Sequence, residues 1–361
     1  MKEYKLDEDF LTRYKAFLAS PEYLQSESHQ KTDYWESQST LLKVDIKGNK
    51  LAVDGSSGFY VPQKNLLEKI EVNYRRILKS PLLIFLKLKL SLVNLLNTTG
   101  YLSYLKAFNK LMAFNPKNLE AKVYADGFSA RSKSRINFFN IASKEGSFKN
   151  IKEVVHAASN RYKLNSQIIY SYYIFNILNF YLKDKSNMNV LEIGGGNGNL
   201  MSVIHDNCPN VTIFDVDLPE TLSSAILFIK DLYPDSKIIL PNEIQDKDLI
   251  KYDFVFMTPS QLESIQDNTF DLAVNLSSFQ EMTKKQVSEY FSLISRSLKN
   301  NACFLTVNRA EKLFDESEPS RFSEYPWRSE NKILAYELDP FFHLVNPNAH
   351  FLKIDKINKD T

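Results

Sequence analysis

The stretch LEIGGGNGNL, Leu191 to Leu200, decides the fold of this 361-residue chain. It begins with an apolar run, holds four of the chain's ten glycines and continues into residues with helical spacing. Glycines let the backbone turn tightly and approach a ligand closely. The stretch therefore predicts a turn between a strand and a helix, the kind of place where nucleotide-type ligands bind.

The rest of the chain after about residue 189 repeats the same alternation. Short apolar runs, rich in β-branched residues, are separated by longer stretches, three of which have helical period; the runs are NVLEIG, VTIFDV, KIIL, FVFM, DLAVNL and ACFLTVN. Pro219 falls in the first turn of the second predicted helix, and Thr283 and Gln286 are spaced as a capping box at the start of the third. The pattern predicts an α/β fold, an open parallel sheet with helices on both faces. KIIL and FVFM lack a full helix between them, so we expect one of them to be an extra or edge strand.

The first part of the chain has a different pattern. Helical period dominates before about residue 150, with a strand-and-turn interruption from Lys43 to Pro62. We predict that residues 1–150 form a mainly helical cap or dimerisation region and that residues 151–361 form the sheet domain. Leu164 to Leu182, apolar and aromatic, is expected to be a helix that closes over the sheet.

Composition excludes several classes of protein. The formal net charge is +2, from 45 basic and 43 acidic residues, which gives no support to nucleic-acid binding. Cys208 and Cys303 lie in no metal-ligand spacing, so reduced buried thiols are expected. The N-terminal MKEYKLDEDF lacks the apolar segment of a signal peptide. These features predict a cytoplasmic protein.

One stretch, Ile77 to Leu96, is apolar enough to raise the question of a membrane. Pro81 and three lysines interrupt it, so it offers no run of roughly twenty apolar residues. A buried helix is the expected structure, and a helix lying on a membrane surface is the alternative.

Three kinds of ligand bind at glycine-rich turns of this type: a nicotinamide dinucleotide, a phosphate group or S-adenosylmethionine. The dinucleotide pattern G-x-G-x-x-G requires a third glycine where this chain has Asn199, and the phosphate loop G-x-x-x-x-G-K-[ST] is absent. The spacing present is E-x-G-x-G-x-G, formed by Glu192, Gly194, Gly196 and Gly198. An acidic residue at the end of the strand suits a cationic ligand better than a pyrophosphate.

The second predicted strand ends in FDVDLPETL, which supplies Asp215 and Asp217. A carboxylate at the end of this strand can accept two hydrogen bonds from the 2′,3′-diol of a ribose. Asp217 is the first candidate for this contact and Asp215 the second. Because Asp217 immediately precedes Leu218-Pro219, capping of the next helix is the alternative role.

LEIGGGNGNL followed by FDVDLPETL, with Glu192 and Asp217 25 residues apart, resembles the class I S-adenosylmethionine-dependent methyltransferases, and the D-L-P form resembles their O-methyltransferase branch. TPSQLESI (Thr258 to Ile265) and NLSSFQEM (Asn275 to Met282) are similar to sugar O-methyltransferases, bacterial proteins of surface-glycan or natural-product pathways. The resemblance covers roughly residues 186–310. It implies a Rossmann-like fold, S-adenosylmethionine as cofactor and methyl transfer to a sugar hydroxyl.

The resemblance also implies which positions contact each part of the cofactor. Those positions are Gly194, Gly196 and Gly198 around the methionine part, Asp217 with Leu218 at the ribose, Thr258, Pro259 and Ser260 beside the adenine, and Asn275 and Ser277 beside the sulfonium and the reacting centre.

The general base departs from the family pattern. Many O-methyltransferases of the D-L-P type have a His-Asp pair just after the fourth strand, where this chain has Gln280-Glu281. Glutamine cannot accept a proton, so Glu281 is the first candidate for the base, with His156 as the second. A loop position near the start of the next helix is the alternative role of Glu281.

We predict no metal, because TVNRAEK after the fifth strand lacks the paired acidic residues of metal-assisted sugar methyltransferases. EYPW, Glu324 to Trp327, is either an aromatic wall for a sugar ring or a packed loop. The expected partner is a small-molecule or glycan acceptor, and a homodimer is a further option. Three alternatives stay open: a polyketide, phenolic or amine acceptor, a non-catalytic S-adenosylmethionine-binding protein, and a nicotinamide oxidoreductase, which Asn199 disfavours.

Overall fold

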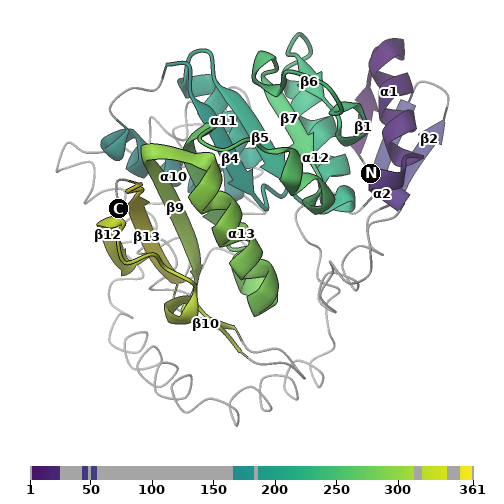
Figure 1. Cartoon of the computed structure of the whole chain (residues 1–361). Helices are drawn as coiled ribbons and strands as arrows, with labels where there is room; N and C mark the ends of the chain where they lie inside the picture. The colour runs from purple at the N-terminus through teal and green to yellow at the C-terminus, as the bar shows by residue number, and fades with distance from the viewer. Residues whose placement is uncertain are drawn as a thin grey trace, which may run out of the picture.

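The computed structural model describes residues 2–24, 43–47, 50–54, 166–182, 186–312, 319–339 and 350–359. Its largest element is an eight-stranded sheet with the order β12-β13-β9-β8-β4-β5-β7-β6 (Figure 1). The strands are β4 (Asn189–Ile193), β5 (Thr212–Val216), β6 (Ile238–Ile239), β7 (Phe254–Met257), β8 (Phe270–Leu276), β9 (Leu298–Arg309), β12 (Lys332–Leu338) and β13 (His350–Lys356).

The neighbouring strands β9, β8, β4, β5, β7 and β6 run parallel to one another. β13 is antiparallel to β9, and β12 is antiparallel to β13. From β4 the chain builds outward through β5 to β6 and β7 on one side, and then crosses to build β8 and β9 on the other. Ligands of open α/β sheets bind at the carboxyl ends of the strands where the direction of building reverses. That point lies between β4 and β8.

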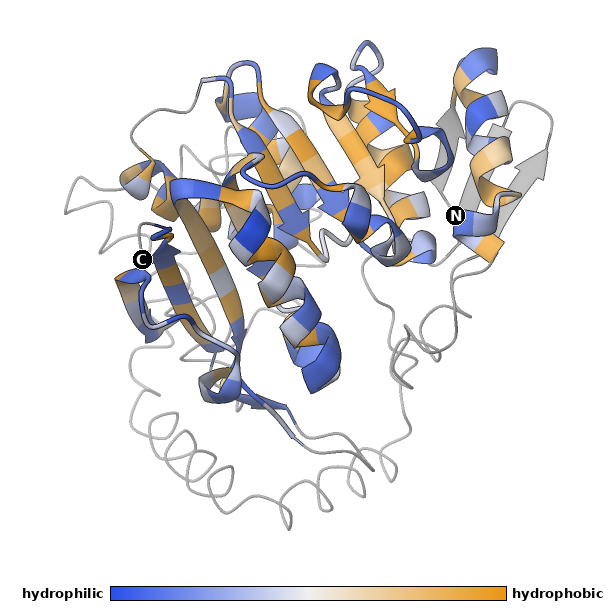
Figure 2. Ribbon diagram, viewed as in Figure 1, coloured by the Kyte–Doolittle hydropathy of each residue, from blue (hydrophilic) through white to orange (hydrophobic). Residues whose placement is uncertain are grey.

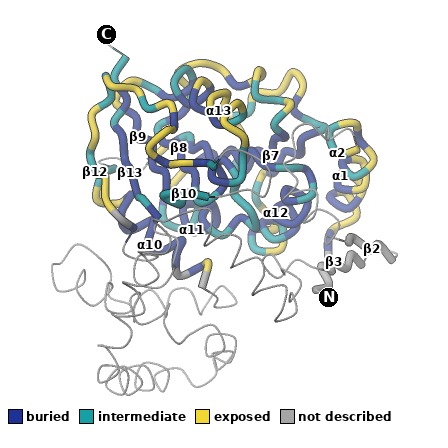
Figure 3. The backbone as a smooth tube through the Cα atoms, turned by 90° about the horizontal axis from the view of Figure 1, so that it is seen from below, coloured by how far each residue is buried: buried dark blue, intermediate teal, exposed yellow. Residues whose placement is uncertain are grey.

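Helices cover both faces of the sheet. On one face α10 (Ser166–Tyr181), α11 (Asn199–Asn207) and α12 (Pro219–Leu232) share a core with alternate strand residues such as Val190. On the other, α13 (Lys284–Ser297) packs with Leu191 and its counterparts. The central strands are mostly hydrophobic in Figure 2 and buried in Figure 3. The predicted α/β class, with helices on both faces of a mostly parallel sheet, is confirmed.

Local signals in the sequence are realised in these elements. The Thr283 hydroxyl accepts a hydrogen bond from the Gln286 amide at 3.3 Å, and Gln286 Oε1 accepts from the Thr283 amide at 2.9 Å, so the predicted capping box is confirmed. Pro219 begins α12, and of KIIL and FVFM, one of which was expected to be an extra or edge strand, KIIL forms the edge strand β6. The helix predicted to close over the sheet is α10, which packs beside α11.

The N-terminal residues pack against the sheet domain. In α1 (Glu8–Leu18) the Tyr14 hydroxyl donates to the Ser223 carbonyl at 3.1 Å, and Arg13 forms an ion pair with Glu243 at 2.7 Å. The short helix α2 (Pro21–Leu24) lies beside α12. Strands β1 (Lys2–Lys5), β2 (Lys43–Lys47) and β3 (Lys50–Asp54) form a separate antiparallel sheet, which is the strand interruption predicted from Lys43 onward.

The predicted boundary at residue 150 and the apolar stretch 77–96 lie outside the described residues. Within the described ranges, no helix combines the length and the apolar character needed to cross a membrane.

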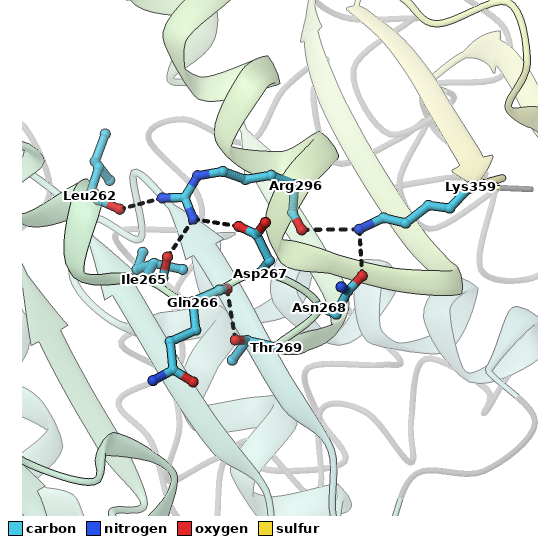
Figure 4. Close-up of polar contacts among 8 residues, drawn as sticks. All are labelled: Leu262, Ile265, Gln266, Asp267, Asn268, Thr269, Arg296 and Lys359. Carbon is cyan, nitrogen blue, oxygen red and sulfur yellow. Dashed lines mark hydrogen bonds and ion pairs between the residues drawn. The ribbon is translucent and has the colours of Figure 1, made fainter. Parts of the chain in front are cut away.

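The segment between β7 and β8 is held by the end of α13 (Figure 4). Arg296 donates to the Leu262 carbonyl at 2.8 Å and to Asp267 Oδ1 at 3.0 Å. Lys359 donates to Asn268 Oδ1 at 2.6 Å and to the Arg296 carbonyl at 3.0 Å. Leu262 lines a cavity at the carboxyl ends of the strands, where the direction of building reverses, so these bonds hold one side of that cavity in place.

Candidate functional site

The glycine turn joins β4 to α11. Gly194 and Gly196 have φ angles of 73° and 61°, in the left-handed region that side chains with a Cβ rarely adopt. A Cβ on Gly194 would lie 2.3 Å from Ser278 Oγ, whereas a Cβ on Gly196 would point into open space. Gly198 precedes α11 as its N-cap residue. The first glycine therefore permits packing within the protein, and the second leaves room for a ligand.

Two carboxylates hold this turn, Asp215 in β5 and Asp217 directly after it. Asp215 Oδ1 accepts from the Gly195 amide at 3.1 Å, and Asp217 Oδ2 accepts from the Gly196 amide at 3.0 Å. Asp217 Oδ1 also accepts from the Leu218 amide at 2.7 Å. The N-cap residue of α12 is Leu218, with no side-chain cap bond, so Asp217 does not have the capping role that the sequence left open.

A cavity of about 370 Å³ opens beside this turn. It lies between the turn, the ends of β5 and β8, and residues of α10 and α13. Of the predicted site residues, the structure brings to its lining Glu192, Gly194, Gly196, Asp217, Leu218, Pro259, Ser277 and Glu281. The lining does not include Gly198, Thr258, Ser260 and Asn275. His156 lies outside the described residues.

The carboxylates of the cavity are unusually buried. Burial, with the nearby charge of Asp217, raises the pKa of Glu192 to about 8. Burial raises the pKa of Asp217 to about 7, although its two backbone amide donors oppose this. Burial also raises the pKa of Asp215, which is fully buried and lies behind the turn. Charged carboxylates in such surroundings require a cation or further hydrogen-bond donors.

Two oxygens show that these donors are missing within the described protein. Glu192 Oε2 and Asp215 Oδ2 are buried and have no hydrogen-bond partner among the described residues. Glu192 faces the cavity, which also exposes the backbone at Gly196. A ligand with a positive charge and hydroxyl or ammonium donors matches this wall. S-adenosylmethionine has these groups in its sulfonium, its ribose and its methionine part.

The ends of β8 and β9 are joined by a buried amide network. Asn275 Nδ2 donates to the Ile193 carbonyl at 2.9 Å and also hydrogen-bonds Ser278 Oγ. Asn308 Nδ2 donates to Asn275 Oδ1 at 2.8 Å, and Asn308 Oδ1 accepts from the Gln280 amide at 3.1 Å. Asn275 was expected beside the sulfonium. Its side chain is fully buried outside the cavity lining and ties β4 to β8, so its place relative to the sulfonium stays a prediction.

Glu281, the predicted base, ends the 3-10 helix η6 (Phe279–Glu281) and lines the cavity. Its Oε1 forms an ion pair with Lys312 Nζ at 3.2 Å. The two side chains are only 13% and 11% exposed, so the pair is shielded from solvent. Burial raises the pKa of the Glu281 carboxyl, and the positive charge of Lys312 opposes that rise.

The sequence did not reveal the roles of Lys312 and Asn308, or the hydrogen bonds by which Gln280 joins η6 to the end of β9. TVNRAEK contains both Lys312 and Asn308, and its only predicted meaning was the lack of paired acidic residues. The signal was present, because a buried strand followed by polar residues marks the carboxyl end of a sheet. Which residue of η6 each of them would meet depends on strand order, and strand order is not visible in the motif.

Other candidates have packing roles. Thr258 is buried, and its hydroxyl hydrogen-bonds Ser260 Oγ at 2.9 Å. EYPW is a packed loop outside the cavity lining: Tyr325 is buried, and the Trp327 ring lies tilted against Phe322 with a centroid distance of 5.0 Å.

Metal binding has no candidate site in the described part of the chain. No group of three or more His, Cys, Asp or Glu residues there has the arrangement of a metal site.

Three features define a class I S-adenosylmethionine-dependent methyltransferase: the glycine turn after β4, the carboxylate after β5, and the cavity where the direction of sheet building reverses. Residues 166–343 match the family model described as a methyltransferase domain, and the protein is an S-adenosylmethionine-dependent methyltransferase. The predicted class of enzyme and its cofactor are thus confirmed.

Solved structures of similar fold include several methyltransferases. A "putative sarcosine dimethylglycine methyltransferase" from Galdieria sulphuraria is 11% identical, with a TM-score of 0.38 over 52% of this chain and 85% of that chain. An S-adenosylmethionine-dependent methyltransferase from Aquifex aeolicus is 14% identical, with a TM-score of 0.34 over 51% of this chain and 88% of that chain. A search of the curated proteins found no match.

Proposed function

We propose that this enzyme transfers the methyl group of S-adenosylmethionine to a hydroxyl of a sugar, in the biosynthesis of a surface glycan or a natural product. One observation carries the proposal: the shielded carboxylate of Glu281 lines the same cavity as Glu192, Asp217 and the glycine turn. A hydroxyl is a poor nucleophile near neutral pH, so it needs a base beside the methyl donor.

In this scheme the side of the cavity formed by the glycine turn, Glu192 and Asp217 binds the cofactor. Asp217 accepts hydrogen bonds from the ribose hydroxyls, for which its carboxylate has lone pairs beyond those used by Gly196 and Leu218. Glu192 supplies a negative charge to the cationic methionine end. When bound, S-adenosylmethionine supplies an electrophilic methyl group whose carbon–sulfur bond breaks with its electron pair passing to sulfur.

The side of the cavity formed by Glu281 acts on the acceptor. A lone pair of the acceptor oxygen forms the new bond to carbon, and Glu281 accepts the proton that this oxygen loses. Holding the acceptor in line with the methyl group supplies much of the acceleration, since the cofactor is already activated. Polar side chains suited to a polyhydroxylated ring also line the cavity: Gln167, Gln286, Glu289 and Tyr290.

The choice of a sugar is supported further by the similarity of TPSQLESI and NLSSFQEM to sugar O-methyltransferases. In the structure these two segments follow β7 and β8 and contribute Pro259, Ser277 and Glu281 to the cavity. The segments that carry the resemblance therefore border the cavity in which cofactor and acceptor would meet.

Binding and transfer assays test the proposal. Calorimetry is expected to show binding of S-adenosylhomocysteine and none of NAD(H). A methyl-transfer screen with nucleotide sugars, free sugars and glycan extracts, beside phenols and amines, is expected to find a sugar acceptor. Transfer only to phenols or amines would refute the sugar acceptor, and binding without any transfer would favour a non-catalytic protein.

The base is tested with a matched pair of variants. Glu281→Gln is expected to lower turnover about 10²- to 10⁴-fold while leaving the affinity for S-adenosylhomocysteine near normal. Glu263→Gln, the same substitution at an exposed position, is the control. Undiminished turnover in Glu281→Gln would remove Glu281 as the base.

A further inference from the structure

Lys312 is the cation that faces the base, and it comes from a different element. It lies in β10 (Glu311–Lys312), which pairs with β11 (Ser320–Arg321) beyond the end of β9. We propose that Lys312 is a positioning residue of methyl transfer, which holds the Glu281 carboxylate ionised at the wall of the cavity. This role rests on the proposed function of Glu281 as the base.

The geometry shows that the pair is built into the fold. The Gln280 amide donates to Asn308 Oδ1 at 3.1 Å, and the Arg309 amide donates to Gln280 Oε1 at 2.8 Å. These bonds fasten η6 to the end of β9 just before Lys312 reaches Glu281 at 3.2 Å. Since the backbones are fixed on both sides, the pair does not depend on two long, mobile side chains finding each other, as exposed pairs do.

The surrounding charges make Lys312 necessary. Glu281 lines the same cavity as two other carboxylates, Glu192 and Asp217, and burial favours its neutral form. The positive charges of Lys312 and Arg309 oppose that effect and lower the pKa of the Glu281 carboxyl. From α13, Glu289 and Tyr290 also line the cavity. A neutral carboxyl cannot accept the acceptor's proton, so the role of the base depends on this compensation.

Infrared difference spectroscopy of the full-length protein tests the proposal without an acceptor. The carboxyl band that disappears in Glu281→Gln is followed against pH in the wild type and in Lys312→Met. We expect its titration midpoint to move to higher pH, by about one to three pH units, when Lys312 is removed. Lys312→Arg restores the charge and is expected to return the midpoint close to that of the wild type. Lys284→Met, which breaks an exposed ion pair with Glu324, is the control and is expected to leave it unchanged.

A structural role for Lys312 would give a different result. The protein would lose thermal stability or affinity for S-adenosylhomocysteine while the Glu281 midpoint stayed in place, and that outcome overturns the proposal. Lys312→Gln keeps a hydrogen-bond donor without the charge, so it serves if Lys312→Met does not fold, and the same upward move of the midpoint is expected. An unchanged midpoint in Lys312→Gln would likewise overturn the role.

Methyl transfer separates the role of Lys312 from that of Glu281. With S-adenosylmethionine and a glycan extract of the source organism, the acidic limb of the rate profile in Lys312→Met is expected at higher pH. At a fixed pH on that limb, the rate should fall about tenfold for each pH unit by which the limb moves. If Glu281→Gln transfers normally, the proposed base is wrong. If Glu281→Gln is inactive but Lys312→Met keeps the wild-type profile, only the role of Lys312 is wrong.

Discussion

Adding one methyl group at two neighbouring glycines is expected to have two different effects. Gly194 and Gly196 both have positive φ angles, so alanine at either position carries a backbone strain of about 1–3 kcal/mol. At Gly194 the new Cβ would also lie 2.3 Å from Ser278 Oγ and 2.4 Å from Ser278 Cβ. At Gly196 it would meet no atom within 4 Å.

The contact at Gly194 cannot be relieved by rotating Ser278, because its Cβ is itself too close. Ser278 is also held by the Ile193 carbonyl and by Asn275. Overpacking of this kind costs about 1–3 kcal/mol beyond the strain. Gly194→Ala should therefore lower the free energy of unfolding by about 2–6 kcal/mol, and Gly196→Ala by about 1–3 kcal/mol.

Urea unfolding of the full-length variants, followed by intrinsic fluorescence, measures the difference, and calorimetry with S-adenosylhomocysteine measures the ligand side. Gly196→Ala should weaken binding strongly, because its methyl group enters the cavity. The double variant Gly194→Ala with Ser278→Gly should recover the stability lost through the contact. Equal destabilisation by the two alanines, within about 0.5 kcal/mol, would refute the assignment of one glycine to packing and the other to the ligand.

Two further predictions concern the carboxylates. Without ligand, the pKa values of Glu192 and Asp217 are raised to about 8 and about 7. The folded protein therefore binds more protons than the unfolded chain between about pH 4 and pH 8, so its melting temperature should fall as pH rises through this range. S-adenosylmethionine should restore the melting temperature. A melting temperature that rises over the same window would contradict the burial of these groups. Asp217→Ala should weaken S-adenosylhomocysteine binding at least about tenfold while Asp215→Asn changes it little, whereas unchanged affinity in Asp217→Ala would move the ribose contact to Asp215.

The elements that the sequence predicts well are those set by neighbours in the chain. The strand-turn-helix around LEIGGGNGNL, the capping box at Thr283 and the proline at the start of α12 depend on residues within a few positions of one another. The short edge strand β6 also follows from local pattern, since no helix separates it fully from β7. Such signals need no knowledge of the tertiary fold.

The parts that could not be predicted depend on strand order. β13 pairs antiparallel with β9 through residues His350 to Lys356, which the sequence showed only as a polar and aromatic end of the chain. The family resemblance placed Asn275 beside the reacting centre, and the structure shows that its side chain contacts Asn308 from the neighbouring strand. The position of Lys312 beside Glu281 joins two segments 31 residues apart, and no spacing rule connects them.

The same strand order separates two kinds of carboxylate at one cavity and directly behind its glycine turn. Glu192, Asp215 and Asp217 come from β4 and from β5 and the residue after it, and within the described chain none of them has a paired cation there. Glu281 follows β8, and the turn after β9 places Lys312 against it. Different surroundings for neighbouring acids are how a site divides binding from proton transfer. The side without a paired cation suits a cationic cofactor, whose charge completes it, and in the proposed mechanism the side that carries Lys312 favours the ionised form of Glu281 before any ligand binds.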